Sequence, residues 1–384
     1  SGRIGTSTDV YSAGNGTSGK PIYNLILPLR GFIENRIPDD QVICENIIPA
    51  PLNAPPAKGG NGGPYTYSWI QSEISNEGPW IPATGINDQQ AFSPPALTDT
   101  TYYARIVSDG SLVDTSFAVL IAVHPALQNN VIVDNDTICA QLSAGELTSL
   151  LEMTGGLGAG TYSYLWEEST DNLNWQSASE INSQFSYTTP VLNETTWYRR
   201  KVNSGACLDS GNVVEIHVLP VLSNNSISPE QIICFEQQPA PLSGTDPVGG
   251  KTGDRRYLWQ SLTSSGNWTD VVTTQEYSPG ILSDSTWYRR IVYSGPNNTC
   301  VNISDSLEIA VLPPISGNTV FNSDTTICAG LPGITVTAGL PTGGDGTYKY
   351  IWQKRPYTGG NWSDAQETTE LLPFMPGTLN DSTR

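Results

Sequence analysis

Aromatic and polar positions alternate in one short segment that recurs four times along the chain. The segment YSYLW at residues 162–166 carries rings at every second position, so on a β-strand they share one face. This segment ends at Trp166, and related segments end at Trp69, Trp259 and Trp352. A period of two predicts strands with one buried side, and we expect these four tryptophans to lie in hydrophobic cores.

The recurrence predicts tandem domains, because self-similarity at a fixed spacing is typical of repeat proteins. The four tryptophans stand at positions 69, 166, 259 and 352. Each repeat shows several short stretches of strand-forming residues separated by turns, which is the pattern of a two-sheet sandwich. We therefore expect an all-β chain, a tandem array of Ig-like antiparallel β-sandwich domains. The expected divisions are 1–33 (the C-terminal strand or strands of a preceding repeat), 34–128, 129–223, 224–316 and 317–384 (the N-terminal part of a further repeat).

A second recurring pattern places tyrosine and arginine two residues apart. We expect the tyrosines to pack across the core against the tryptophans, and the arginines to follow on the same face. A guanidinium stacked on an aromatic ring or paired with a carboxylate is the expected role, and a ligand-binding arginine is the alternative. The residues concerned are Tyr103, Tyr198, Tyr288, Arg105, Arg200 and Arg290.

Charge and hydropathy exclude two classes of partner. The 384 residues carry a net charge of −19, with a pI near 4.3. Such a surface repels phosphate backbones, so we expect no nucleic-acid binding. No apolar run is long enough to span a bilayer, so we expect no direct membrane insertion. The chain opens at Ser1 without a signal peptide, and we interpret it as an internal piece of a longer protein.

The six cysteines occupy two recurring positions. Cys44, Cys139, Cys234 and Cys328 share the first position, and Cys207 and Cys300 share the second. Pairing within each repeat predicts the disulfides Cys139–Cys207 and Cys234–Cys300, each worth about 4 kcal/mol of stability. Repeat one has Ser111 at the second position, so Cys44 is predicted to be free, and the partner of Cys328 would lie beyond Arg384. Disulfides imply an oxidising, extracytoplasmic setting.

Catalytic chemistry is hard to place in this sequence. With two histidines, His124 and His217, a Ser-His-Asp set is difficult to assemble, and both are expected to be solvent-facing strand residues. No nucleophile elbow, phosphate loop or HExxH motif occurs. The Gly-Gly pairs that recur in every repeat are explained by turns that need positive φ. We expect no enzyme activity, no cofactor and no zinc site.

Calcium is the one metal that the sequence leaves open. Acidic residues gather where repeats meet, and calcium can rigidify arrays through such oxygens. Their spacing matches no calcium loop, so solvated loops are the preferred interpretation. The residues are Asp39, Asp40, Asp134, Asp136, Glu230 and Asp324.

The string "IC…PAPLSG…GG…YLWQ…W…YSPGILSDSTWYRRIVYSG…C…IAVLP" resembles the Ig-like repeats of very large surface proteins of Bacteroidota. The similarity extends over residues 34–384, although repeat one lacks the second cysteine. The resemblance implies adhesins, including the mobile gliding adhesin exported by type IX secretion, or stalks of surface enzymes. It also implies O-glycosylation of Asp-Ser/Thr-apolar steps, which here means Thr137 and Ser306.

We therefore expect a structural and adhesive rod segment of a large bacterial cell-surface adhesin or extracellular filament. Its partner would be a ligand on a cell surface or substratum, with a glycan as one class. The alternatives are spacer repeats of a secreted multidomain enzyme and sandwiches that bind carbohydrate through Trp80, Trp175, Trp268 and Trp362. Self-assembly into a filament or sheath is a further alternative.

Small-angle scattering of this chain tests the rod hypothesis. The linkers between repeats are short and lack Gly/Ser-rich runs, so they cannot act as long tethers. At roughly 40 Å per domain, judged from strand length plus loops, three complete repeats should extend over about 120 Å. A maximum dimension near 60 Å, the value of a compact globule of this mass, would contradict the hypothesis.

Overall fold

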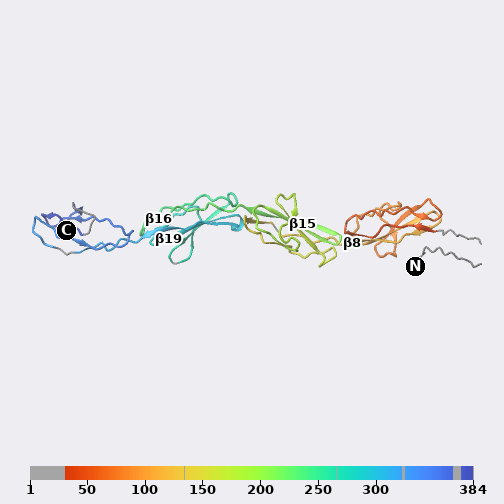
Figure 1. Cartoon of the computed structure of the whole chain (residues 1–384), viewed down its shortest axis with the longest axis horizontal. Coiled ribbons are helices and arrows are strands. Elements are labelled where there is room, and N and C mark those ends of the chain that lie inside the picture. Colours follow the sequence, from red (N-terminus) through yellow and green to blue (C-terminus); the bar gives the residue numbers. More distant parts are fainter. Residues whose placement is uncertain (1–30, 134, 265, 322–324, 366–372, 384) are drawn as a thin grey trace, which may run out of the picture. The chain divides into compact units, whose positions relative to one another are not determined.

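The computed structural model describes residues 31–384 except 134, 265, 322–324, 366–372 and 384 (Figure 1). Its regular elements are strands and one short 3-10 helix, η1 (Pro296–Asn298). The closing strand expected within residues 1–33 lies mostly outside the described residues. What is described there is β1 (Phe32–Glu34), which pairs with β3 (Lys58–Gly59).

Each of the three complete repeats contains one main sheet with the same order of strands. The first sheet runs β2-β8-β6-β4-β5 with β7 beside β6, the second runs β12-β11-β14-β15-β9, and the third runs β16-β21-β19-β17-β18 with β20 beside β19. In the first repeat the strands are β2 (Gln41–Cys44), β4 (Thr66–Ser72), β5 (Ile81–Pro82), β6 (Thr101–Ser108), β7 (Val113–Thr115) and β8 (Val119–His124). In the second they are β9 (Asp136–Cys139), β11 (Ser163–Ser169), β12 (Gln176–Ser177), β14 (Thr196–Ser204) and β15 (Cys207–Leu219). In the third they are β16 (Gln231–Cys234), β17 (Arg255–Leu262), β18 (Thr269–Val272), β19 (Thr286–Ser294), β20 (Cys300–Ile303) and β21 (Leu307–Leu312).

A second, less regular layer completes each sandwich. In the second repeat it is formed by β10 (Glu146–Leu147) with β13 (Tyr187–Thr188) and by the bridge between Leu142 and Leu192. In the first and third repeats, the bridges Leu52–Phe92 and Leu242–Tyr277 correspond to the pairing of β10 with β13. The chain is therefore an all-β tandem array of Ig-like β-sandwich domains.

The fourth repeat contains only two-stranded pairings among its described residues. These are β22 (Val320–Phe321) with β24 (Thr337–Ala338), β23 (Leu331–Pro332) with β27 (Thr378–Leu379), and β25 (Gln353–Lys354) with β26 (Ser363–Asp364).

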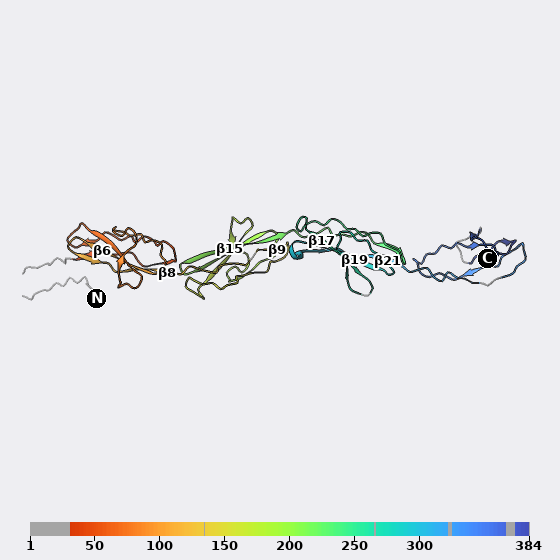
Figure 2. The ribbon, with the colours of Figure 1, turned by 180° about the vertical axis from the view of Figure 1, so that it is seen from behind.

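The opening and closing strands of each complete repeat pair in parallel. Figure 2 labels one such pair, β9 and β15 of the second repeat. In the second repeat, β9 lies beside β15 with Cys139 opposite Leu219. In the first and third repeats, Cys44 lies opposite His124 and Cys234 opposite Leu312. Because the pairing is parallel, the cysteine at the end of the opening strand lies at the end of the sheet where the chain leaves the repeat.

A three-ring cluster fills each core. Trp166 and Tyr198 are fully buried, and Tyr187 lies between them, with centroid distances of 5.6 Å to Trp166 and 5.4 Å to Tyr198. The indole Nε1–H of Trp166 donates to the carbonyl of Gln184 at 3.0 Å, so its one polar group is satisfied. Equivalent clusters are Trp69, Phe92, Tyr103 and Trp259, Tyr277, Tyr288, while Trp352 stacks on Phe374 at 5.1 Å.

We predict that Trp166→Ala destabilises the second repeat by about 3–5 kcal/mol, since it removes a fully buried ring and leaves a cavity. Hydrogen exchange of the full chain, read by mass spectrometry, should show that loss in peptides from β11, β14 and β15. The control is Leu173→Ala, whose side chain is 81% exposed and whose substitution should stay within about 0.5 kcal/mol. Equal protection in the two variants would contradict the assigned core.

Candidate functional site

Three arginines that the sequence places after the core tyrosines are completely buried. Arg105, Arg200 and Arg290 each have 0% exposure. The guanidinium of Arg200 lies over the rings of Phe185, at 4.8 Å, and Tyr164, at 5.5 Å. Stacking on aromatic rings is therefore the role that the structure gives these residues.

These guanidinium groups form no ion pair among the residues that the structure describes. Neutral acceptors replace a carboxylate: Arg290 donates to the carbonyl of Thr245 at 2.6 Å and to Asn225 Oδ1 at 2.8 Å. Burial lowers the pKa of all three arginines from the usual value of an arginine. Arginine side chains are not deprotonated in proteins, so the groups stay charged, and carbonyl oxygens and ring faces offset the desolvation cost.

An asparagine that none of the motifs above predicted is the recurrent partner of each buried arginine. Asn130 Oδ1 accepts from Arg200 Nε at 3.0 Å, and its Nδ2 donates to Asp209 Oδ2 at 2.9 Å. In the first repeat, Asn35 Oδ1 accepts from Arg105 Nε at 2.9 Å. The signal was present, since Asn35, Asn130 and Asn225 recur at the spacing of the tryptophans. Each fixes the chain at the start of a repeat to the core of that repeat.

The hydroxyls of Tyr103 and Tyr198 have no hydrogen-bond partner within the described part of the chain. Burial, with a smaller contribution from the charge of Glu73, raises the pKa of Tyr103 to about 12. Burial also raises the pKa of Tyr198. Both phenols therefore remain neutral at physiological pH and act as packing groups.

The second tryptophan of the repeat, considered above for carbohydrate binding, has one ring face covered in three repeats. Arg199 lies over Trp175 at 4.2 Å, Arg289 over Trp268 at 4.3 Å and Arg355 over Trp362 at 4.7 Å. Trp362 is 50% exposed, and the other two rings are partly buried. A sugar stacking on the covered face would first have to displace an arginine.

Arg199 is also held from its other side by a carboxylate. Its Nε donates to Glu167 at 2.6 Å, and Lys201 Nζ donates to the same carboxylate at 2.8 Å. Burial raises the pKa of Glu167, but the bonds from Lys201 and Arg199 outweigh burial, so the net pKa is lowered. The bond to Glu167 therefore helps to hold Arg199 over the ring of Trp175.

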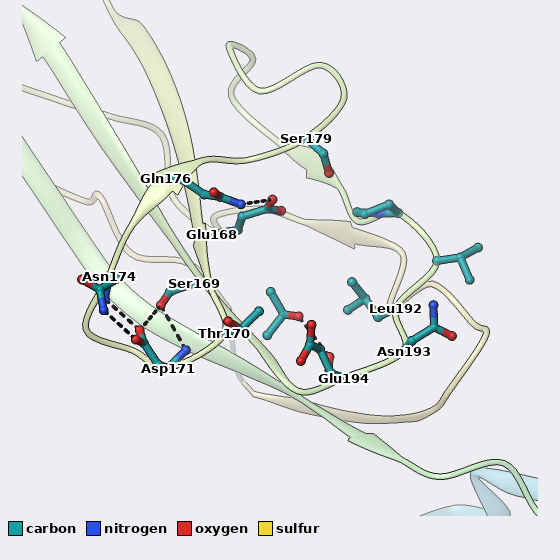
Figure 3. A pocket seen from close by; sticks show the side chains of 13 residues that line it. Glu168, Ser169, Thr170, Asp171, Asn174, Gln176, Ser179, Leu192, Asn193 and Glu194 are labelled. Atoms are coloured by element: carbon teal, nitrogen blue, oxygen red, sulfur yellow. Dashed lines mark hydrogen bonds between the residues drawn. The ribbon is translucent and has the colours of Figure 1, made fainter.

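One pocket of about 470 Å³ opens in the second repeat (Figure 3). Its wall is mostly polar and includes Glu168, Asp171, Gln176 and Glu194. Asp171 accepts hydrogen bonds from the backbone and side chain of Asn174, from the backbone of Leu173 and from Ser169, and these bonds lower its pKa (Figure 3). The carboxylate is therefore committed to the turn that it stabilises.

No group of three or more His, Cys, Asp or Glu side chains that could hold a metal occurs in the described ranges. Of the acidic junction residues, Asp40 accepts from the backbone of Leu120 at 2.7 Å and Asp136 from that of Thr137 at 2.7 Å. Asp134 and Asp324 lie outside the described residues. Calcium at the junctions stays a prediction.

The two histidines lie in different surroundings. His217 is on β15 with a half-exposed side chain, 3.6 Å from Glu215. His124 ends β8, is partly buried, and its Nδ1 accepts from the backbone N–H of Ala206 at 3.3 Å. The part of the chain that the structure describes also contains no helix long and apolar enough to cross a membrane.

The disulfides join consecutive repeats. Cys44 of the first repeat bonds Cys207 of the second, with a Cα–Cα distance of 4.9 Å. Cys139 of the second repeat bonds Cys300 of the third, with a Cα–Cα distance of 5.2 Å. Among the described cysteines, Cys234 and Cys328 form no disulfide and are exposed.

The predicted pairs Cys139–Cys207 and Cys234–Cys300 are therefore wrong, as is the prediction that Cys44 is free. The strand register gives the reason: Cys139 lies opposite Leu219, whereas Cys207 is the first residue of the same 13-residue strand. That separation corresponds to about 40 Å of extended chain, and a disulfide needs Cα atoms within about 7 Å. The two cysteine positions thus lie at opposite ends of one sandwich, and each can meet only a cysteine of a neighbouring repeat.

A close backbone contact supports each of these junctions. Gly155, with φ of 86°, lies against the linker that precedes its repeat, where an added Cβ would come within 2.0 Å of the carbonyl of Ala126. Gly249 repeats the arrangement, with its Cβ position 1.9 Å from the carbonyl of Val221. The Gly-Gly pairs therefore recur for positive φ, as the sequence indicated, and for close approach to the linker.

Each disulfide lies within one compact unit of the structure. Thr154–Tyr162 and Asn203–Leu208 belong to the second repeat in sequence but cluster with the first repeat. The Cys44–Cys207 bond thus lies within this unit, and the Cys139–Cys300 bond within the other. In the second unit, Cys139 and Cys300 pack with Leu219, Leu222 and Val292 in a small buried cluster.

The three complete repeats also correspond to a known family. The sequence model of a domain of unknown function, DUF8696, matches residues 33–125, 128–220 and 223–313. The chain belongs to this family. No curated protein matches this DUF8696 chain.

Several solved structures resemble the DUF8696 chain at low identity. The three N-terminal domains of the bacteriophage RB49 highly immunogenic outer capsid protein (Hoc) align over 73% of this chain and 99% of that one, with 13% identity and a TM-score of 0.36. Domains A168–A170 of titin align over 73% and 98%, with 15% identity and a TM-score of 0.31. The N-terminal four Ig domains of Dscam1 isoform 4.44 align over 84% and 86%, with 13% identity and a TM-score of 0.22.

Thiol labelling of the denatured, non-reduced chain tests the disulfide pairing. Alkylation should mark Cys234 and Cys328 in the wild type, because these are the cysteines without a disulfide. Cys44→Ser should add a label at Cys207, its partner. Cys234→Ser serves as the matched control and should add none. A label at Cys44 in the wild type would contradict the pairing between repeats.

Proposed function

We propose that this chain is a force-transmitting structural segment of a large bacterial cell-surface adhesin or extracellular filament. Its Ig-like repeats would give reach, and a ligand-binding region elsewhere in the full protein would contact a cell surface or substratum. The chain itself would carry out no catalysis and hold no cofactor.

The observation that carries the proposal is the pair of disulfides between consecutive repeats. Together with the Ig-like domains, these disulfides indicate an extracellular or secreted protein. A disulfide within a domain stabilises that domain alone, whereas one between domains adds a second covalent connection across each junction. Such a connection is useful when the junction itself must resist separation.

The recurrent features support a mechanical role over a binding role. The positions that repeat most regularly are core rings, buried arginines with their asparagines, and the glycines and cysteines of the junctions. The pocket described above, in contrast, is lined by residues of the second repeat. Type IX export, an origin in Bacteroidota, and O-glycosylation at Thr137 and Ser306 are further parts of the proposal and rest on the resemblance of the repeats.

Cells that produce the full-length protein can test the role directly. An antibody against the repeats should label intact cells, and in-frame deletion of residues 129–223 should reduce retention of the cells under flow without reducing the label. The reason is that the deletion shortens the reach of the protein and leaves its ends intact. Leu173→Ala, an exposed change in the same repeat, is the control and should alter neither measurement. Labelling only after permeabilisation would exclude a surface role.

A further inference from the structure

Both disulfides connect the same two structural positions. In each bond one cysteine is the last residue of an opening strand, Cys44 of β2 or Cys139 of β9. The other is the first residue of a strand that leads out of the next repeat, Cys207 of β15 or Cys300 of β20. The sequence separations are 163 and 161 residues. In both bonds, therefore, the first cysteine position of one repeat is joined to the second cysteine position of the following repeat.

The bond shortens the covalent path along the chain. From Gln41 to Leu219 that path consists of β2, the disulfide and β15, which are strands of 4 and 13 residues. A β-strand rises about 3.3 Å per residue, close to the maximum reach of a polypeptide, so each of these two strands is already almost fully extended. The residues between Cys44 and Cys207, which include Trp166 and most of the core around it, lie outside this path.

The two bypassed segments also overlap. Cys139 lies between Cys44 and Cys207 in sequence, and Cys207 lies between Cys139 and Cys300. Most of the second repeat is therefore enclosed by both disulfides. Opening one bond leaves the other in place, so much of that repeat keeps one covalent bypass.

We propose that the disulfides between repeats form a covalent bypass that carries pulling force around the sandwich cores. The inference rests on the proposed force-transmitting role. Tension that enters through β2 passes to β15 through sulfur, and the hydrogen bonds of the first and second sandwiches are not pulled apart to transmit it. While the bonds are intact, the chain resists extension even where the stability of a single repeat is low.

Single-molecule force measurements on the full chain can test the bypass. Handles would be attached through azide-bearing residues in place of Asp39 and His217, which both have exposed side chains and flank the loop closed by Cys44–Cys207. The wild type should not release the 163-residue loop at forces that unfold the domains. Cys44→Ser should release about 95 residues, from Cys44 to Cys139, and lengthen by about 330 Å more than the wild type, because Cys139–Cys300 holds the rest of the loop while the third repeat is folded. Cys234→Ser, which removes a cysteine that forms no disulfide, is the matched control and should behave as the wild type.

A second measurement covers the case in which Cys44→Ser fails to fold. A dithiol added to the wild-type molecule is oxidised to its own disulfide, and the Cys44–Cys207 bond takes up two electrons and two protons to give two thiols. The same molecule should then change from the short to the long extension. Equal extensions before and after reduction, with reduction confirmed by thiol labelling, would overturn the bypass.

The outcomes separate the two proposals. A wild type that lengthens as far as Cys44→Ser would overturn the bypass and leave the surface role untouched. A bypass that operates in the isolated chain, while deletion of residues 129–223 leaves retention under flow unchanged, would overturn the force-transmitting role and leave the bypass intact.

Discussion

The parallel pairing of the first and last strands of each complete repeat sets where the chain enters and leaves that repeat. It places the end of the opening strand beside the end of the closing strand, as where Cys139 lies opposite Leu219. The chain then leaves the repeat from the end where the first cysteine position lies. The second position, at the start of the closing segment, lies a full strand length away. This geometry prevents a disulfide within the repeat and directs both cysteines toward neighbouring repeats.

A buried positive charge is the second unusual feature of the fold. A guanidinium such as that of Arg200 would be costly to bury alone, because its charge loses the solvation of water. The fold supplies ring faces, carbonyl oxygens and the amide of Asn130 in place of a carboxylate. Since Asn130 follows the linker directly, the same hydrogen bond that satisfies the charge also anchors the start of the repeat. One side chain therefore joins the start of the repeat to its core.

Recurrent chemistry concentrates at the cores and at the junctions. Gly155 and Gly249 approach the preceding linker so closely that no side chain would fit, and the disulfides close the same junctions covalently. The loops between these regions vary from repeat to repeat in length and sequence. The positions that recur from repeat to repeat are therefore those that fix the cores and the junctions.

The all-β class and the core rings could be predicted from the sequence, because a period of two along a strand is a local property that Trp166 and its neighbours display directly. The sequence also indicated the arginines, since two residues along a strand return to the same face. It did not lead to Asn130 as their partner, because asparagine is equally common in turns, and the contact spans 70 residues. The disulfide pairing could not be predicted without the strand register of the folded chain. Spacing shows that Cys139 and Cys207 belong to one repeat, but the parallel register of β9 with β15 shows that they lie at opposite ends of it.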